Sequence, residues 1–377
     1  MILKNAKILD ENFVFQNSDV EISEQLISKI GNLSGENEID FEGKYIVPGL
    51  CDIHTHGCVG FDSSAEISPE NINEMSDFYA SNGITTYLAT VTTCSKERML
   101  SAVKRIRYSI ENGVSGANIG GIHLEGPFFS MEKKGAQNPD FIRRPDYEEF
   151  INLYNESGKN VKIISIAPEA EGAIDFIKEA SKLVRVSMAH TDADEKQARD
   201  AISAGATNMT HTFNGMRSLH HRTPNAVGAA LDSDTICEFI CDGHHINKTI
   251  IRLMYKLIGA DRMAFISDSL LVAGFADGVY KRADAENDMT VENGLAKTSD
   301  GTICGSASNL FAGVKNAISF GIPAEDAFKM ASITPAKAAG IDDVCGSISV
   351  GKRADLLILD KDFNIEKIIV RGKFLNR

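Results

Sequence analysis

The chain has 377 residues, of which 43% are hydrophobic, so it can bury a core large enough for one big domain with a smaller one attached. Its formal net charge of -13 argues against a nucleic acid or an acidic membrane surface as the main partner. No apolar stretch approaches the roughly 18 residues that a membrane span needs. The seven cysteines include no C-x-x-C pair, and residues 1–10 lack the apolar segment of a secretory signal, so we expect a cytoplasmic protein.

Both ends of the chain are predicted to consist of β-strands. The N-terminal part contains short strand-like segments separated by polar turns, at Ile2–Leu9, Phe13–Ile22, Leu26–Ile30 and Tyr45–Val47. The C-terminus resumes this character at Ala354–Asp360 and Ile365–Val370. The simplest architecture joins residues 1–48 and 345–377 into one small β-sandwich domain beside a larger central domain.

The central residues 49–344 alternate between strand-like and helix-like segments. The apolar, strand-like runs are Leu50–Ile53, Ile84–Val91, Asn118–Leu124, Val161–Ile166, Val184–Ala189, Ala206–Thr210, Thr235–Cys241 and Met263–Ser267. The helix-like segments are Ser68–Ser81, Ser95–Asn112, Gly172–Leu183, Asp194–Ala204, Asn247–Gly259 and Ser306–Phe320. Eight strands separated by crossover helices predict an α/β fold of the (β/α)8, TIM-barrel type.

Polar residues follow several of the predicted strands at their carboxyl ends, where the active site of such a barrel lies. His54 and His56 are two residues apart, so both imidazoles can point to the same side of an extended backbone. The other polar residues at strand ends are Glu125, His190, His211 and Asp268. Taken alone, the two histidines are equally compatible with polar residues at a strand end, but their coincidence with the other four favours a metal site.

Histidine and carboxylate ligands without cysteine suit Zn²⁺, and also Fe²⁺, Mn²⁺ or Co²⁺. Such an ion lowers the pKa of water from 15.7 to about 7 and polarises a carbonyl group, which is hydrolytic chemistry. Asp268, alone at the last strand, is the candidate proton shuttle between the attacking water and the leaving group. The alternatives for Asp268 are a metal ligand or a buried hydrogen-bond acceptor.

The motif His54-Thr55-His56, with His190, His211 and Asp268, resembles the amidohydrolase superfamily. More specifically, the segment 123–128, His-Leu-Glu-Gly-Pro-Phe, is similar to that of N-acetylglucosamine-6-phosphate deacetylases. The similarity continues in family order through 134–139, 167–169, 211–216, 221–224, 228–231, 242–245, 267–268, 305–307 and 334–336. These motifs span most of the chain, which makes a chance match a poor explanation.

The resemblance implies a role for each matching residue. It implies that Glu125, His190 and His211 bind the principal metal ion, that His54 and His56 form a second metal position retained by some members, and that Asp268 is the acid–base catalyst. It also implies that Asn214, the backbone of Gly215 and His245 lie at the substrate. Arg222 matches a phosphate-binding arginine that the neighbouring subunit of a homodimer donates, and a guanidinium is well suited to phosphate.

One residue departs from the family pattern. Gln137 stands where the family usually has a histidine that helps to polarise the acetyl carbonyl. An amide N–H can still donate a hydrogen bond to that carbonyl, but it cannot become cationic. This departure from the family pattern concerns two properties, namely how the acetyl carbonyl is activated and which sugar is preferred.

The resemblance implies metal-dependent hydrolysis of the acetamide of N-acetylglucosamine-6-phosphate, with one or two divalent ions per chain. The alternatives are the galactosamine-6-phosphate epimer as substrate, another amidohydrolase reaction such as cyclic-amide hydrolysis or deamination, and a non-catalytic barrel. The motif around Glu125 and the presence of Arg222 argue against the other reactions. A barrel that has lost its catalytic function tends to lose its metal ligands as well, whereas all the expected metal-ligand positions are filled here.

Overall fold

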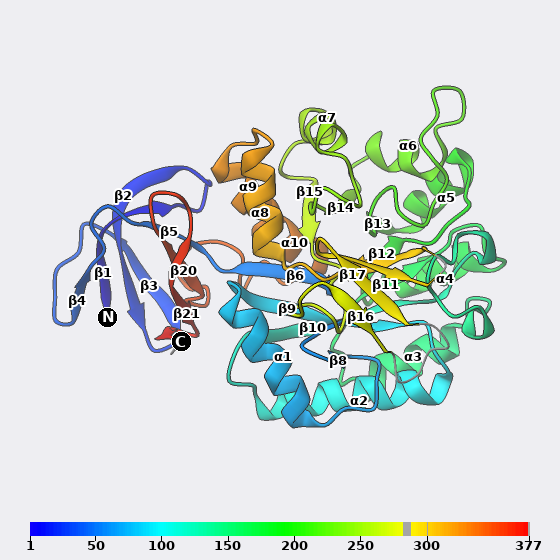
Figure 1. Cartoon of the computed structure of the whole chain (residues 1–377), viewed down its shortest axis with the longest axis horizontal. Helices are drawn as coiled ribbons and strands as arrows, with labels where there is room; N and C mark the ends of the chain where they lie inside the picture. Colours follow the sequence, from blue (N-terminus) through cyan, green and yellow to red (C-terminus); the bar gives the residue numbers. More distant parts are fainter. Residues whose placement is uncertain (282–287, 300, 376–377) are drawn as a thin grey trace.

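The computed structural model describes residues 1–281, 288–299 and 301–375. A sheet built from both chain ends lies beside a barrel of parallel strands wrapped in helices (Figure 1). Residues 376–377 of the predicted end domain lie outside the described residues. Among the described residues, no helix combines the length and the apolar character needed to cross a membrane.

The barrel consists of eight parallel strands that pair with one another in chain order. They are β6 (Leu50–Thr55), β9 (Ile84–Thr92), β10 (Asn118–Phe128), β11 (Val161–Ile166), β12 (Arg185–Met188), β13 (Ala206–Met209), β14 (Ile236–Ile240) and β15 (Met263–Ile266). The barrel closes where the amide N–H of Asp268 donates to the carbonyl oxygen of His54 at 3.0 Å. The predicted (β/α)8 barrel is therefore confirmed.

Seven helices connect these strands, an eighth follows the last one, and together they cover the outside of the barrel. They are α1 (Pro69–Ser81), α2 (Lys96–Asn112), α3 (Tyr147–Glu156), α4 (Ala173–Ala180), α5 (Glu195–Ala204), α6 (Asn225–Leu231), α7 (Lys248–Ile258) and α8 (Leu310–Ser319). The side chain of Ser68 accepts from the N–H of Asn71 at the start of α1, which satisfies a helix-end donor as the Ser-Pro pair predicts. Helices α3 and α6 were not among the predicted segments, and α9 (Ala324–Met330) and α10 (Ile333–Ala339) follow α8.

The second sheet joins the two chain ends. Its strands are β1 (Ile2–Leu9), β2 (Phe15–Ser23), β3 (Leu26–Gly31), β4 (Glu38–Asp40), β5 (Tyr45–Pro48), β20 (Leu356–Leu359), β21 (Ile365–Val370) and β22 (Lys373–Phe374). The ends meet where β5 pairs antiparallel with β20. Side chains alternate between its faces: Ile46 and Ile358 pack in the core of this sheet, whereas Val47 and Leu357 join the main core shared with the barrel.

A four-stranded antiparallel sheet follows the last barrel strand and was not predicted. It comprises β16 (Gly278–Tyr280), β17 (Met289–Glu292), β18 (Leu295–Thr298) and β19 (Ile303–Ser306). Figure 1 shows its yellow strands in front of the barrel. Its buried side chains Met289, Val291 and Ala296 form a separate small core with Leu270 and Val272. The segment predicted as a helix from Ser306 consequently begins later, at Leu310.

Candidate active site

The six polar residues predicted at strand ends meet at one mouth of the barrel. His54 ends β6 with Thr55, whereas Glu125 lies inside β10, which runs three residues past it and is longer than predicted. His190, His211 and Asp268 each stand two residues beyond a strand and adopt positive φ angles of 41°, 29° and 48°. Residues other than glycine rarely adopt this conformation, and it clusters at functional sites.

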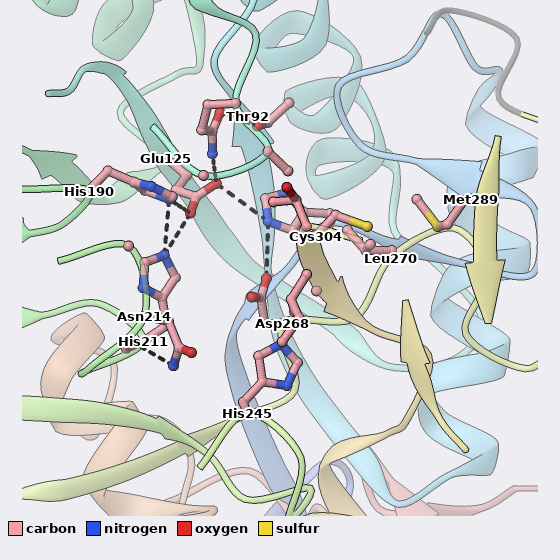
Figure 2. A pocket seen from close by; sticks show the side chains of 18 of the residues that line it. Thr92, Glu125, His190, His211, Asn214, His245, Asp268, Leu270, Met289 and Cys304 are labelled. Atoms are coloured by element: carbon pink, nitrogen blue, oxygen red, sulfur yellow. Dashed lines mark hydrogen bonds and ion pairs between the residues drawn. The ribbon is translucent and has the colours of Figure 1, made fainter. Parts of the chain in front are cut away.

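Glu125 lies at the centre of this group. Its Oε1 is 3.2 Å from the Nε2 atoms of both His190 and His211, which are 3.1 Å from each other (Figure 2). The Nε2 of His54 lies 3.5 Å from the same oxygen, and the Nε2 of His56 lies 3.5 Å from Oε2. Asp268 closes the group, because its Oδ1 is 3.3 Å from His56 and 3.5 Å from His54. All six side chains are buried.

This donor set fits one or two divalent metal ions. Tetrahedral zinc at about 2.0–2.1 Å from its ligands sets those ligands roughly 3.3–3.4 Å apart, close to the separations among Glu125, His190 and His211. The buried Nε2 of His54 has no hydrogen-bond partner among the described residues. Two groups have the spacing to hold an ion, Glu125 with His190 and His211, and Glu125 with His54 and His56. The predicted ligand sets are thus brought together, while their roles stay predictions.

Both central carboxyl groups are held in the ionised form. Burial alone would raise the pKa of Glu125, but the close imidazoles of His190, His211 and His54 outweigh it and place that pKa well below its ordinary value. For Asp268, burial is outweighed by the nearby imidazoles of His54 and His56, so its pKa is also lowered. An ionised Asp268 can accept a proton, which is the first task of an acid–base catalyst.

The side chain of Gln137 is fixed in one orientation. The hydroxyl of Thr92 and the backbone N–H of Thr93 both donate to its Oε1, at 2.8 and 3.1 Å. Its Nε2 therefore faces Glu125, and donates to Oε2 of that residue at 2.6 Å. Because an amide nitrogen carries two hydrogens, one N–H is left over at the cavity wall.

A cavity of about 290 Å³ opens above this group, and the predicted substrate residues Gln137, Asn214, Gly215 and His245 line it. A side chain at Gly215 would place its Cβ 2.8 Å from Nδ1 of His190, and its φ is +60°, so glycine is required there. His245 is held by Asp242, whose Oδ2 lies 2.6 Å from its Nδ1, which leaves the buried Nε2 at the cavity without a described partner. Met289 and Ile303 of the additional sheet complete the wall.

Arg222 is the predicted site residue that the structure does not bring to the cavity. It is exposed and lines a separate hollow on the surface, together with Arg217 and Asp194. None of the described residues that line the cavity of this chain is lysine or arginine. In a single chain, the cavity wall as described thus lacks a permanent cation for an anionic substrate.

Two polar residues next to the site, the buried Glu238 and the partly buried Thr92, were not predicted to act there. Glu238 lies within β14, with Oε2 3.2 Å from Nδ1 of His54. Thr92 orients Gln137. Glu238 could have been found from the sequence, because it is a charged residue inside the apolar run 235–241. On a strand of a closed barrel, such a side chain must face the interior. His123 lies beneath the site and contacts the carbonyl oxygen of Ile53 and the hydroxyl of Ser165.

Comparisons with known proteins identify the family. The sequence pattern of the Amidohydrolase family matches residues 45–375. The chain belongs to the amidohydrolase family. Among members of known activity, an N-acetylglucosamine-6-phosphate deacetylase of Vibrio furnissii is 37% identical over 88% of this chain and 82% of its own. An N-acetylgalactosamine-6-phosphate deacetylase of Escherichia coli O157:H7 is 31% identical over 99% of this chain and 98% of its own.

Solved amidohydrolase structures agree with the sequence comparison. An N-acetylglucosamine-6-phosphate deacetylase from Pasteurella multocida superposes with a TM-score of 0.92 at 31% identity, covering 100% of this chain and 99% of the other. The same architecture, including the sheet from both chain ends, is therefore present in a solved structure of the family. As an amidohydrolase with this degree of similarity, the chain is an enzyme.

Proposed function

We propose that the protein hydrolyses the acetamide of N-acetylglucosamine-6-phosphate, giving glucosamine-6-phosphate and acetate, and that it works in the cytoplasm. The observation that carries the proposal is the meeting of Glu125, His190 and His211 with Asp268 at the floor of one cavity. The similarity of nearly the whole chain to deacetylases of 6-phosphorylated N-acetylhexosamines supports the choice of substrate.

In the proposed reaction, Asp268 moves the proton. It accepts a proton from the attacking water, whose oxygen forms a bond to the acetamide carbonyl carbon. It then gives that proton to the amide nitrogen as the carbon–nitrogen bond breaks, so that acetate and the amino sugar leave. The free N–H of Gln137 is placed to donate to the carbonyl oxygen, where negative charge develops during the attack.

A divalent ion would be held by Glu125, His190 and His211, and a second by His54 and His56. When bound, it acidifies water and polarises the carbonyl group. Imidazole and carboxylate donors favour Zn²⁺, with Fe²⁺, Mn²⁺ or Co²⁺ as alternatives. The chain orients these donors through its backbone: the carbonyl oxygen of Lys133 lies 2.9 Å from Nδ1 of His190, so the Nε2 lone pair of that imidazole faces Glu125.

One assay separates the proposed function from its rivals. The purified protein is incubated with either 6-phosphorylated N-acetylhexosamine epimer, and acetate and ammonia are measured together with the metal content. Acetate release that stops on chelation and returns with added metal supports the proposal. Ammonia release would point to another amidohydrolase reaction, and the absence of bound metal, with no rescue by added metal, would favour a non-catalytic barrel.

The galactosamine epimer is the second candidate substrate, because the chain is also similar over 99% of its length to an N-acetylgalactosamine-6-phosphate deacetylase, and Gln137 is the candidate selector between the epimers. We expect Gln137→His to change the ratio of kcat/KM for the two epimers by about tenfold or more, because the amide would be replaced by a ring that cannot keep the contacts with Thr92 and Thr93. Steady-state kinetics on both epimers measure the ratio. Thr92→Val, which removes one of those contacts alone, is the control, and an unchanged ratio in Gln137→His would exclude Gln137 as the selector.

We propose further that the enzyme is a homodimer in which Arg222 of one subunit binds the phosphate in the site of the other. Its position outside the cavity of its own chain supports this arrangement. Arg222→Ala should lower kcat/KM about 10–10²-fold, mainly through KM, because hydrogen bonds to charged groups contribute about 1.5–3 kcal/mol. Arg199→Ala is the control, since that exposed arginine pairs with Glu195 and Asp232 of its own chain.

Mixed dimers test the exchange of Arg222 between subunits. An Arg222→Ala chain keeps Asp268, and an Asp268→Asn chain keeps Arg222, so each hybrid dimer contains one complete site. Random mixing of the two inactive variants should restore about a quarter of the wild-type activity. No recovery after subunit exchange, verified by mass spectrometry of the mixed dimers, would place Arg222 in its own chain's site or outside it.

A further inference from the structure

Glu238 is a fully buried carboxylate that the proposed reaction does not use. It lies in β14, and its side chain has no exposed surface. Its Oε2 lies 3.2 Å from Nδ1 of His54 and 3.4 Å from the backbone nitrogen of His211, while its Oε1 has no hydrogen-bond partner among the described residues. Burying a carboxylate costs free energy unless it is paired, so the contact of Glu238 with His54 indicates a specific role for this pair.

The contact decides which nitrogen of His54 carries a proton. Oε2 of Glu238 already accepts from the backbone N–H of His211, and an oxygen in that role accepts from a ring N–H as well, so Nδ1 of His54 is the donor. The opposite nitrogen, Nε2, points at Glu125 and Asp268, 3.5 Å from an oxygen of each. With Nδ1 protonated in the neutral ring, Nε2 presents a lone pair to the cavity floor, which is the form that a metal ion binds.

Glu238 could instead be a metal ligand, because His54, His123 and Glu238 have the spacing to hold an ion. Both ring nitrogens of His123 are already engaged, with the carbonyl oxygen of Ile53 at 3.0 Å and the hydroxyl of Ser165 at 2.7 Å. Binding an ion there would break one of these buried contacts. Among the described side chains, Nδ1 of His54 is the ring nitrogen that Glu238 contacts without such a loss.

We propose that Glu238 is a positioning residue: it fixes the Nδ1–H form of His54 and thereby creates the second metal position, at His54 and His56. This inference rests on the proposed metal-dependent function. It makes Glu238, rather than the two histidines alone, the determinant of whether the chain holds one ion or two. The ring of His190 does not depend on this contact, because the carbonyl oxygen of Lys133 orients it separately.

The test measures metal binding without substrate. Apoprotein of the wild type and of Glu238→Leu and Glu238→Gln is titrated with Co²⁺ and with Zn²⁺, following the cobalt absorption bands and the bound equivalents. We expect two equivalents in the wild type, and a second equivalent bound about 10–100-fold more weakly in Glu238→Leu, the usual cost of losing such a partner. Glu238→Gln should be affected less, because its amide oxygen can still accept from Nδ1.

A matched control and a direct view of the ring complete the experiment. Glu149→Gln alters another buried carboxylate, which pairs with Arg143 and does not line the cavity, and it should leave both equivalents unchanged. In protein with ¹⁵N-labelled histidine, the wild type should show His54 protonated at Nδ1, and folded Glu238→Leu should lose that signal. His54→Asn assigns the resonance, and circular dichroism establishes that each variant is folded.

Two results would overturn the inference. One is an unchanged second equivalent and an unchanged His54 tautomer in folded Glu238→Leu. The other is a wild type that binds a single equivalent and keeps it after His54 and His56 are both replaced. Failure of the proposed function would give a different result: the protein would bind two metal equivalents and show the expected His54 tautomer, but it would release no acetate.

Discussion

Asparagine in place of Asp268 should lower kcat by about 10²–10⁴-fold, the range that a positioned acid–base group contributes. Its Oδ1 lies 3.3 Å from Nε2 of His56, at the floor of the cavity, and the histidines around it hold its pKa below the ordinary value. Asparagine keeps the shape of the side chain but cannot take up and return a proton. Because substrate binding does not need that proton, KM should change little.

Metal content distinguishes the role of Asp268 from its alternatives. If Asp268 acts as the proton carrier, Asp268→Asn retains the bound metal of the wild type, and single-turnover experiments show slow release of acetate. If Asp268 is instead a metal ligand, the same variant loses metal in proportion to activity. If Asp268→Asn fails to fold and shows neither of these effects, Asp268 is a buried hydrogen-bond acceptor and takes no part in the chemistry.

The sequence predicts the barrel well because its signals are local and repeated. Each barrel strand is a short apolar run, and predicted boundaries such as those of Val161–Ile166 agree with the structure. Residues that follow the strands in the sequence must meet at one end of a closed barrel. That geometry is why His54, His190, His211 and Asp268 could be grouped before their distances were known.

The additional sheet escaped prediction for a physical reason. Strands β16 to β19 have three or four residues each, and their stability comes from pairing with one another and from a small core around Val291 and Ala296. Such short segments carry little periodicity of their own. Yet they matter for the site, because Met289 and Ile303 form part of the cavity wall.

Residues that act through their neighbours were equally hard to predict. The contact of Glu238 with His54 joins β14 to β6. The two residues are 184 positions apart in the sequence, and no local sequence pattern predicts their contact. The orientation of Gln137 depends on Thr92 and Thr93 in the same way. For Arg222 and the sugar phosphate, only family resemblance provided an expectation, since one chain does not contain the geometry that would test it.

Glutamine in place of Glu125 should remove all bound metal and abolish activity, and this is the largest effect that the geometry predicts. Among the described residues, this carboxylate lies within 3.5 Å of all four site histidines: Oε1 faces His54, His190 and His211, and Oε2 faces His56. An amide has one oxygen and no charge to offer in place of two charged oxygens. Metal affinity should therefore fall by more than about 10²-fold, beyond the usual cost of losing an outer-shell partner.

Thermal unfolding with and without metal measures this effect independently of catalysis. Ligand at 100 times its dissociation constant stabilises a folded protein by about 2.7 kcal/mol, so added Zn²⁺ should raise the Tm of the wild type but not that of Glu125→Gln. Replacing His54 and His56 together is the informative contrast, because it should remove one equivalent and leave a smaller Tm increase from the ion at Glu125, His190 and His211. Loss of all metal in that double variant would instead place the principal ion at His54 and His56.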